Sequence, residues 1–474
     1  MCIQFIDRRS ELERLDSFWD TPEGIYVLWG RRRVGKTTLL QKFSEDKPSI
    51  YLMATNETEK GILENFTREV AAFFEDPALS NTTFDSFKDL IRYMEEKREE
   101  RLLLIIDEFP YLCDANKSVP SIIQREWDSG DMEGMNIILS GSTVSAMESE
   151  VLGSKSPLYG RRTGQYKLSP LDPIQARGFF PEIPLLDYLK LYATIGGTPE
   201  YLLKMESDKE LIPNIIDNIA DPGSMLHEEP ELLLKSEVRE PRTYFSILKA
   251  LSFGRSTPNE IATFVDVQRT SISRYLKLLI KLDLVEKRVP VTEKHPEKTR
   301  KGRYFIQDPF FRFYFRFIFQ HKPQLEQGLY EGLKDTLKGE FNTYMGPAFE
   351  DIVLAALIQM EKNDETPFTF HKIGPWWSNE GQEIDIVAFN GSTKEIMFVE
   401  CKWSDLDEQR TRDIVTSLEE KAELVKWDPE NRKEHYMVAG RSVEGTHDVQ
   451  TLSLEDIKKV TKTKRSSRSR ERDL

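Results

Sequence analysis

The stretch that decides the fold covers residues 24–44 and reads GIYVLWGRRRVGKTTLLQKFS. An apolar run enters a loop bounded by Gly30 and Gly35, and the chain leaves the loop through Lys36 and Thr37 into residues of helical periodicity. Glycines let backbone N–H groups close around an anion, and a helix start adds unpaired donors and the positive end of its dipole. The pattern is that of a phosphate-binding loop.

The polar residues of this loop suit a triphosphate. Lys36 supplies a point charge for the β- and γ-phosphates, and the Thr37 hydroxyl is a ligand for Mg²⁺. We therefore expect ATP and Mg²⁺ as the cofactors of an ATP-hydrolysing enzyme. The residues expected to hold the nucleotide are Gly30, Arg31, Arg32, Arg33, Val34, Gly35, Lys36, Thr37 and Thr38.

A buried strand predicted at residues 102–106 ends in Asp107 and Glu108. In a P-loop ATPase the first acid of such a tip holds the Mg²⁺ hydration shell, together with Thr37, and the second polarises the attacking water. We assign these roles to Asp107 and Glu108. Another strand, at 135–140, is followed by a polar turn in which Ser140 or Ser142 could sense the γ-phosphate; a simple turn is the alternative.

Composition limits the class of protein. The 474 residues are too many for one core, and the net charge of −14 argues against a surface that coats nucleic acid nonspecifically. The three cysteines, Cys2, Cys113 and Cys401, have no metal-ligand spacing and fit a reducing compartment. No apolar run has the length of a membrane span or a signal peptide. We expect a cytoplasmic protein without membrane contact.

Several sequence motifs together resemble those of the archaeal/prokaryotic ATPase family in the STAND branch of AAA-related P-loop NTPases. They are residues 5–8, 30–37, 104–108, 138–142 and 196–202, and the resemblance covers about residues 2–235. The family usually has proline at the second loop position, where this chain has Arg31. The resemblance implies that Pro199 lies near the adenine and that nucleotide state drives a conformational switch.

Residues 242–306 follow a different pattern, of short helices and then two strands around a basic turn. This predicts a helix-turn-helix with a β wing. The predicted recognition helix exposes Arg269, Thr270, Ser271, Ser273 and Arg274, and the wing carries Lys294, Lys298, Arg300, Lys301 and Arg303. Contact with DNA and contact with protein both remain open for this segment. The aromatic stretch at 309–319 is expected to be core.

The C-terminal region combines a helix from residue 346 with strands at 382–389 and 395–403. Glu350, Asp385 and Glu400 are expected to hold a metal ion, and Lys402 to orient or deprotonate water, because unpaired charges on apolar strands are costly. The set resembles a PD-(D/E)xK restriction-endonuclease-like domain, with Ile384 in place of the proline. The same Glu-x-Lys pattern recurs at 419–421 on a helix expected to be exposed.

The predicted fold is thus α/β: a doubly wound parallel P-loop NTPase sheet with a helical lid, a winged helix-turn-helix and a restriction-endonuclease-like α/β domain. The expected ranges are 1–168 for the ATPase core, 169–240 for the lid, 241–308 for the winged helix, 309–345 for connecting helices, 346–458 for the nuclease-like domain and 459–474 for a basic tail. We expect an ATP-driven switch that meets DNA through its winged helix and C-terminal domain. The alternative is a nucleotide-controlled signalling or scaffold protein with an inactive nuclease-like domain, and the oligomeric state stays open.

Overall fold

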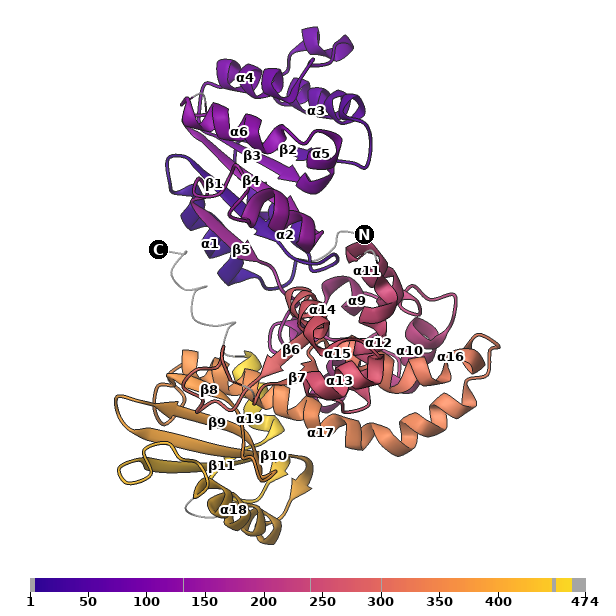
Figure 1. Ribbon diagram of the computed structural model, residues 1–474, viewed down its shortest axis with the longest axis vertical. Helices are drawn as coiled ribbons and strands as arrows, with labels where there is room; N and C mark the ends of the chain where they lie inside the picture. The colour runs from indigo at the N-terminus through magenta and orange to yellow at the C-terminus, as the bar shows by residue number, and fades with distance from the viewer. Residues whose placement is uncertain (1–4, 131, 239, 300, 446–448, 463–474) are drawn as a thin grey trace. The chain divides into compact units, whose positions relative to one another are not determined.

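The computed structural model describes residues 5–130, 132–238, 240–299, 301–445 and 449–462 (Figure 1). The chain divides into two compact units. The first comprises Met1–Pro170, Thr198–Glu200 and Lys235–Arg239, and the second comprises the remaining residues. The residues beyond 462, which hold most of the predicted basic tail, and Arg300 of the predicted wing lie outside the described part of the chain.

The first unit is built on a five-stranded parallel sheet of order β2-β3-β4-β1-β5. The strands are β1 (Gly24–Trp29), β2 (Ser49–Met53), β3 (Leu102–Asp107), β4 (Met135–Gly141) and β5 (Gly164–Lys167). The helices are α1 (Arg9–Trp19), α2 (Lys36–Ser44), α3 (Glu59–Phe73), α4 (Phe87–Lys97), α5 (Phe109–Ala115), α6 (Val119–Asp128) and α7 (Val144–Met147).

Helices cover both faces of this sheet, because its strands are apolar on both sides. Leu15 of α1 and Phe43 of α2 pack with Leu28 and Ile105 on one face. The helices α3 to α6 pack on the other face, against residues such as Leu104 and Ile137. The prediction of a doubly wound α/β core is therefore confirmed. The edge strand β5 was not predicted as a strand, since its four residues are polar or half-exposed.

The first half of the second unit is mainly helical. Its helices are α8 (Leu185–Ile195), α10 (Leu211–Ile215), α12 (Pro241–Ser252), α13 (Pro258–Val265), α14 (Arg269–Lys281), α15 (Pro309–Phe313) and α16 (Phe319–Leu325). Helices α9 (Pro199–Leu202) and α11 (Glu229–Glu237) contribute residues to both units. Strands β6 (Val285–Arg288) and β7 (Arg303–Ile306) form an antiparallel pair after α14. The aromatic residues at 310–318 are buried, as predicted for core.

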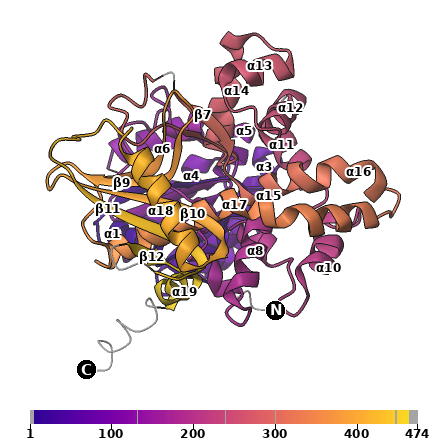
Figure 2. The same cartoon turned by 90° about the horizontal axis from the view of Figure 1, so that it is seen from below.

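A second sheet fills the C-terminal half, in the order β12-β11-β10-β9-β8. Its strands are β8 (Lys372–Trp377), β9 (Glu383–Asn390), β10 (Glu395–Leu406), β11 (Lys433–Val443) and β12 (Gln450–Leu452). The sheet is mixed, with β9 antiparallel to both of its neighbours and β10 parallel to β11. Helix α17 (Glu331–Lys362) lies on one face and α18 (Glu408–Ala422) on the other, as Figures 1 and 2 show.

Two predicted boundaries need correction. The division at 345/346 falls inside α17, which runs from Glu331 to Lys362 through Pro347. A helix was expected to begin at Gly346, but α17 already runs through this position and contains Pro347 in its interior. The tail predicted from residue 459 also begins inside a helix, α19 (Leu454–Lys462). Among the described helices, none is both long enough and apolar enough to cross a membrane.

Candidate functional site

The loop between β1 and α2 depends on its first glycine. Gly30 has φ +151°, and a Cβ atom at this position would lie 2.3 Å from the Leu168 carbonyl oxygen, so any side chain would collide with backbone. Gly35 has φ +92° and is the residue directly before α2. Arg33 has φ +71°, a conformation that costs a non-glycine residue energy. The loop is thus fixed in a bend that the sequence alone would not favour at Arg33.

Lys36 is folded over this loop. Its ammonium donates hydrogen bonds to the carbonyl oxygens of Gly30, at 2.8 Å, and Arg31, at 3.1 Å. Burial lowers the pKa of Lys36 to about 8, although the charges of Glu108, Asp107 and Glu237 raise it. The side chain is 6% exposed. These carbonyl acceptors are neutral groups with only partial negative charge. A phosphate with a full negative charge would stabilise the buried ammonium of Lys36 more strongly.

The acids at the tip of β3 face the start of α2. Thr37 Oγ1 donates to Asp107 Oδ2 at 2.8 Å, and the Tyr51 hydroxyl donates to the same oxygen at 2.6 Å. Glu108 is in a left-handed conformation with φ +52°, and its two carboxylate oxygens accept from Ser142 Oγ at 2.7 and 2.9 Å. The predicted metal-side pair and the predicted water-polarising acid therefore lie at one edge of the sheet.

Of the two serines considered as sensors, Ser142 belongs to this site through its bonds to Glu108. Ser140 is buried in β4, and its hydroxyl has no hydrogen-bond partner among the described residues. Tyr51 was missed by sequence reasoning. Alternate side chains of a strand point to opposite faces of the sheet, and the sequence does not say which face of β2 lies toward Asp107.

The loop also contacts a segment of the first unit that is distant in sequence, Thr198–Glu200. Arg31 is 1% exposed, and its Nη2 donates to Thr198 Oγ1 at 2.6 Å. Arg33 Nε lies 3.8 Å from Glu200 Oε2, and a Cβ at Gly35 would lie 3.8 Å from Pro199 Cγ. The turn containing Pro199 thus contacts the phosphate loop, while the placement of adenine beside Pro199 stays a prediction.

On the N-terminal side, Arg8 is buried and in a left-handed conformation with φ +65°. Its Nη2 donates to the carbonyl oxygens of Val34, at 3.0 Å, and Ser169, at 2.7 Å. The guanidinium therefore positions the back of the loop. Of the other predicted nucleotide residues, Arg32 is exposed and bonds the Tyr111 hydroxyl at 2.9 Å, and Thr38 lies half-buried in the first turn of α2.

Glu237 was not predicted, although it lies in the first unit beside these groups. Its side chain is buried, and its Oε2 has no hydrogen-bond partner in the described part of the chain. Burial raises the pKa of Glu237 to about 7, against a backbone hydrogen bond from Val144 and the charges of Arg32 and Lys36, which lower it. No local motif surrounds Glu237 in the sequence, so only tertiary structure could reveal it.

These residues fit ATP with Mg²⁺. Lys36 bonds carbonyl oxygens where phosphate oxygens would be stronger acceptors, and Thr37 and Asp107 present adjoining oxygen atoms, which Mg²⁺ prefers. Bound Mg²⁺ would supply positive charge to the β- and γ-phosphates. Lys36, Thr37 and Asp107 are the residues that would hold this pair of ligands.

A second group of charged residues lies in the second unit, around the start of β9 and the middle of β10. Lys402 Nζ donates to Glu400 Oε1 at 2.8 Å, and Asp385 Oδ2 accepts from the Cys401 N–H at 2.8 Å. Lys421 Nζ lies 3.1 Å from both Glu400 oxygens. The expectation that residues 419–421 lie on an exposed helix is wrong for Lys421, which is 20% exposed, because the C-terminal half of α18 packs against β10.

Two of the acids carry strongly raised pKa values. Burial, followed by the charges of Asp385 and Asp351, raises the pKa of Glu350 to about 8. Burial and the charge of Glu400 raise the pKa of Asp385 to about 6. For Lys402, the hydrogen bond and charge of Glu400 outweigh burial and raise the pKa. Repulsion among partly buried acids is the condition that a bound cation relieves.

The predicted metal ligands are not gathered on one side of the sheet. Glu350 lies on α17, whereas the Glu400 carboxylate bonds to Lys421 of α18, on the opposite face (Figure 1). Within the described ranges, no group of three or more His, Cys, Asp or Glu side chains is arranged to hold a metal ion. A metal site at Glu350, Asp385 and Glu400 therefore stays a prediction.

Comparison with known proteins now assigns the class. Residues 5–205 match the family described as an ATPase domain predominantly from Archaea, and residues 314–414 match a family of archaeal and bacterial proteins of unknown function. Together with the loop geometry, the first match defines a P-loop ATPase domain.

The full length of the chain has a relative as well. It is 35% identical over 462 residues to the uncharacterized protein MJECL04 of Methanocaldococcus jannaschii, which covers 95% of this chain and 99% of that protein. The chain belongs to the same family as this protein, and it joins an archaeal-type ATPase domain to a second, C-terminal domain. A shorter stretch of 46 residues is 46% identical to the ATP-binding protein MJ0423 of the same organism, covering 10% of this chain and 78% of that protein.

Among solved structures, the Walker-type ATPase PABY2304 of Pyrococcus abyssi is similar, with 20% identity and a TM-score of 0.49. The similarity covers 66% of this chain and 96% of the Pyrococcus chain.

Proposed function

We propose that the protein is an ATP-hydrolysing switch, in which the nucleotide state of the first unit controls the second. The observation that carries the proposal is the Thr37–Asp107 hydrogen bond, with Glu108 next to it and Lys36 above the loop. Lys36 would exchange loop carbonyls for phosphate oxygens. Glu108, once released from Ser142, would accept the proton of the attacking water.

Two variants test this function. In Lys36→Ala we expect Mg²⁺-dependent ATP turnover to fall below detection, because the phosphates lose the buried ammonium group that lies over the loop. In Glu108→Gln we expect kcat to fall by about 10²–10⁴, the usual contribution of a general base. The measurement is phosphate release by the purified full-length chain.

Matched controls come from the same helix and its end. Lys42→Ala removes a lysine of α2 that is 45% exposed, and Glu45→Gln changes its exposed partner. Both should keep the turnover of the parent protein. Unchanged turnover in folded Lys36→Ala and Glu108→Gln proteins would contradict the ATPase proposal.

A second candidate function is phosphodiester cleavage of DNA in the second unit. The raised pKa values of Glu350 and Asp385 favour it, because catalytic acids are often placed where burial and like charge perturb them. We expect cleavage with Mg²⁺ or Mn²⁺, lost in Asp385→Ala and in Lys402→Ala. The absence of cleavage would favour the rival class, a nucleotide-controlled scaffold with an inactive nuclease-like domain.

The segment α12–β7 is proposed to be a winged helix. Ile272, Leu276 and Leu279 are buried in α14, while Arg269 and Arg274 are exposed on the same helix. If α14 meets DNA, affinity should fall steeply with salt and should weaken in Arg269→Ala and Arg274→Ala. A flat salt response would favour protein contact instead.

A further inference from the structure

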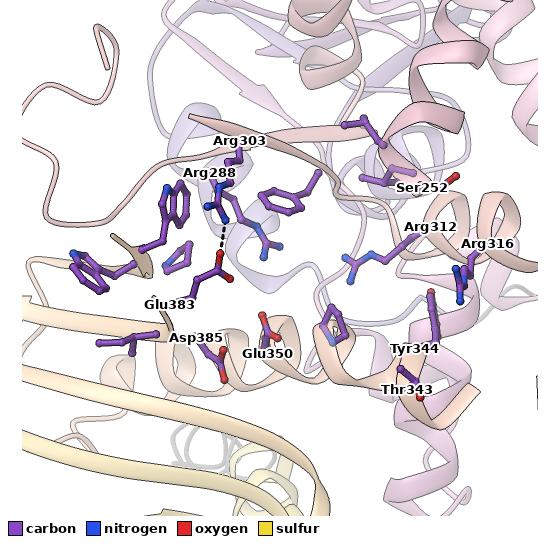
Figure 3. A pocket seen from close by; sticks show the side chains of 18 residues that line it. Ser252, Arg288, Arg303, Arg312, Arg316, Thr343, Tyr344, Glu350, Glu383 and Asp385 are labelled. Carbon is purple, nitrogen blue, oxygen red and sulfur yellow. Dashed lines mark hydrogen bonds and ion pairs between the residues drawn. The ribbon is translucent and has the colours of Figure 1, made fainter. Parts of the chain in front are cut away.

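A cavity of about 460 Å³ opens in the second unit beside the two acids with raised pKa values. Glu350 of α17 and Asp385 of β9 line it together, as Figure 3 shows. Its other walls come from the β6–β7 pair, from α12, from α15 and the segment after it, and from β8. The proposed winged helix and the C-terminal sheet therefore share one pocket.

The pocket combines guanidinium groups with aromatic rings. Arg288, Arg303, Arg312 and Arg316 line it, and so do Phe305, Tyr344, Trp376 and Trp377. The Arg303 guanidinium carbon lies 4.8 Å from the centre of the Trp377 ring. A guanidinium group can donate two parallel hydrogen bonds to the oxygens of one phosphate. An aromatic ring can stack on any nucleic-acid base, whatever the sequence.

The four arginines differ in how firmly they are held. Arg288 and Arg312 each lie 2.6 Å from a different oxygen of Asp351, whose pKa these two cations lower despite its burial. Arg303 and Arg316 instead pair with Glu383 and Glu340, which are 55% and 49% exposed. Because exposed ion pairs contribute little, separate phosphates can replace Glu383 as the partner of Arg303 and Glu340 as the partner of Arg316.

The size of the cavity limits the ligand. A volume of about 460 Å³ lies in the range of pockets that enclose one small organic molecule, and a double helix is far too wide to enter it. We propose that this pocket receives one nucleotide of a nucleic-acid single strand, with its base against the aromatic wall and its phosphate on Arg303. Arg316, at the opposite end of the pocket (Figure 3), would contact another phosphate of the same strand. The proposal rests on the proposed nuclease function in that the same acids, Glu350 and Asp385, form part of the wall.

The test is strand binding by the full-length chain without divalent metal, so that it does not depend on cleavage. The probe is a 5′-phosphorylated, fluorescently labelled twelve-residue oligothymidylate, read by anisotropy in EDTA. We expect Arg303→Ala and Arg316→Ala each to weaken binding about fivefold to tenfold. Each variant should also lower the slope of log affinity against log salt by about 0.7, the value for one phosphate contact on a single strand.

Arg441→Ala is the matched control. Arg441 lies on β11, is 31% exposed and pairs with Asp405, whereas Arg303 is 29% exposed and pairs with Glu383. The Arg441 variant should bind the strand as the parent protein does. An equal loss in the Arg303 and Arg441 variants would overturn the proposal, and so would unchanged binding in both pocket variants.

Three further arms distinguish other ligands. A blunt duplex of the same length should bind more weakly than the strand. Thymidine 5′-monophosphate should displace the strand better than inorganic phosphate; equal displacement would mean simple anion binding and would overturn the proposal. Loss of strand binding in Arg269→Ala/Arg274→Ala, but not in the pocket variants, would place the strand on α14 instead. If strand binding follows the prediction and cleavage is never seen, only the nuclease function fails.

Discussion

The two candidate sites differ in how the fold brings their residues together. In the first unit Lys36, Thr37, Asp107, Glu108 and Ser142 all follow parallel strands, so the carboxyl edge of one sheet collects them. In the second unit the charged residues come from a helix, two strands of opposite direction and a second helix on the other face. Parallel topology makes a site predictable from strand ends, and mixed topology does not.

The electrostatic states of the two sites differ as well. The ATP site contains a cation whose pKa is lowered, Lys36, facing acids that already have hydrogen-bond donors. The second site contains acids whose pKa values are raised, Glu350 and Asp385. Thus burial disfavours the charge of a cation in the first site, and burial with mutual repulsion disfavours the charges of acids in the second site.

The largest effect on stability is expected from removing the hydrogen bond between Arg31 of the phosphate loop and Thr198 of the neighbouring turn. Arg31→Ala removes a side chain that is 1% exposed together with its bond to Thr198, and should lower the free energy of unfolding by about 2–4 kcal/mol. Urea denaturation and hydrogen exchange of peptides from residues 24–44 measure this. Arg32→Ala, at the exposed next position, should stay within about 0.5 kcal/mol. Equal effects would mean that Arg31 does not hold the loop.

A smaller effect, of opposite sign, is expected in the second unit. The pKa of Glu350 is raised to about 8 in the folded protein from an ordinary value of 4.5, so the folded state binds the extra proton between these values and stability falls as pH rises through that window. Glu350→Gln removes the penalty. It should stabilise the protein at pH 8 by on the order of 2 kcal/mol, and by much less at pH 5.

The readout for Glu350→Gln is the thermal midpoint at the two pH values. Glu361→Gln on the same helix serves as control. A Glu350→Gln variant that is less stable than the parent protein at pH 8 would show that the carboxylate is compensated by a partner.

The smallest predicted effect concerns the affinity for nucleotide. Lys36 has its pKa lowered to about 8, so without nucleotide it loses its proton above that pH, and binding of the phosphates must then restore it. Affinity for a non-hydrolysable ATP analogue should be about tenfold weaker at pH 9 than at pH 7, as a proton uptake of one predicts. Calorimetry in buffers of different ionisation enthalpy measures both quantities.

The Lys36→Arg variant tests the origin of this pH dependence, because arginine keeps its charge over the whole range. Its affinity should not change between pH 7 and pH 9. A flat profile in the parent protein would show instead that Lys36 stays protonated over this range without nucleotide.

Most of the first unit could be predicted from its sequence. The apolar runs at 24–29, 102–106 and 135–140 predict buried strands. Gly30, Gly35 and Lys36, which follow the first run, form the pattern of a phosphate-binding loop. What the sequence could not reveal are contacts between distant positions. Examples are the hydrogen bonds from Arg31 to Thr198 and from Arg8 to Val34, and the burial of Glu237. They depend on how loops fold back in three dimensions, which the periodicity of a sequence does not predict.

In the second unit the strands containing Asp385 and Glu400 were recognised, but β8, β11 and β12 were not. The helix that supplies Lys421 was expected, but as an exposed helix without a contact to Glu400. Alternation predicts that Glu400 and Lys402 share a face, and the 2.8 Å bond between them agrees. It cannot predict which helix covers that face. The metal-ligand set was inferred without this knowledge. It therefore combines Glu350 of α17 with Glu400, whose carboxylate bonds to Lys421 of α18.

Helix α17 has a consequence for how this chain can be divided. Its 32 residues form a rod of about 48 Å that begins among the connecting helices and ends beneath the C-terminal sheet. A genetic exchange at residue 346 would cut this rod in mid-length, next to the fully buried Met345. A chain divided at this position would expose apolar surface of α17 in both halves, so each part depends on the helix that it shares with the other.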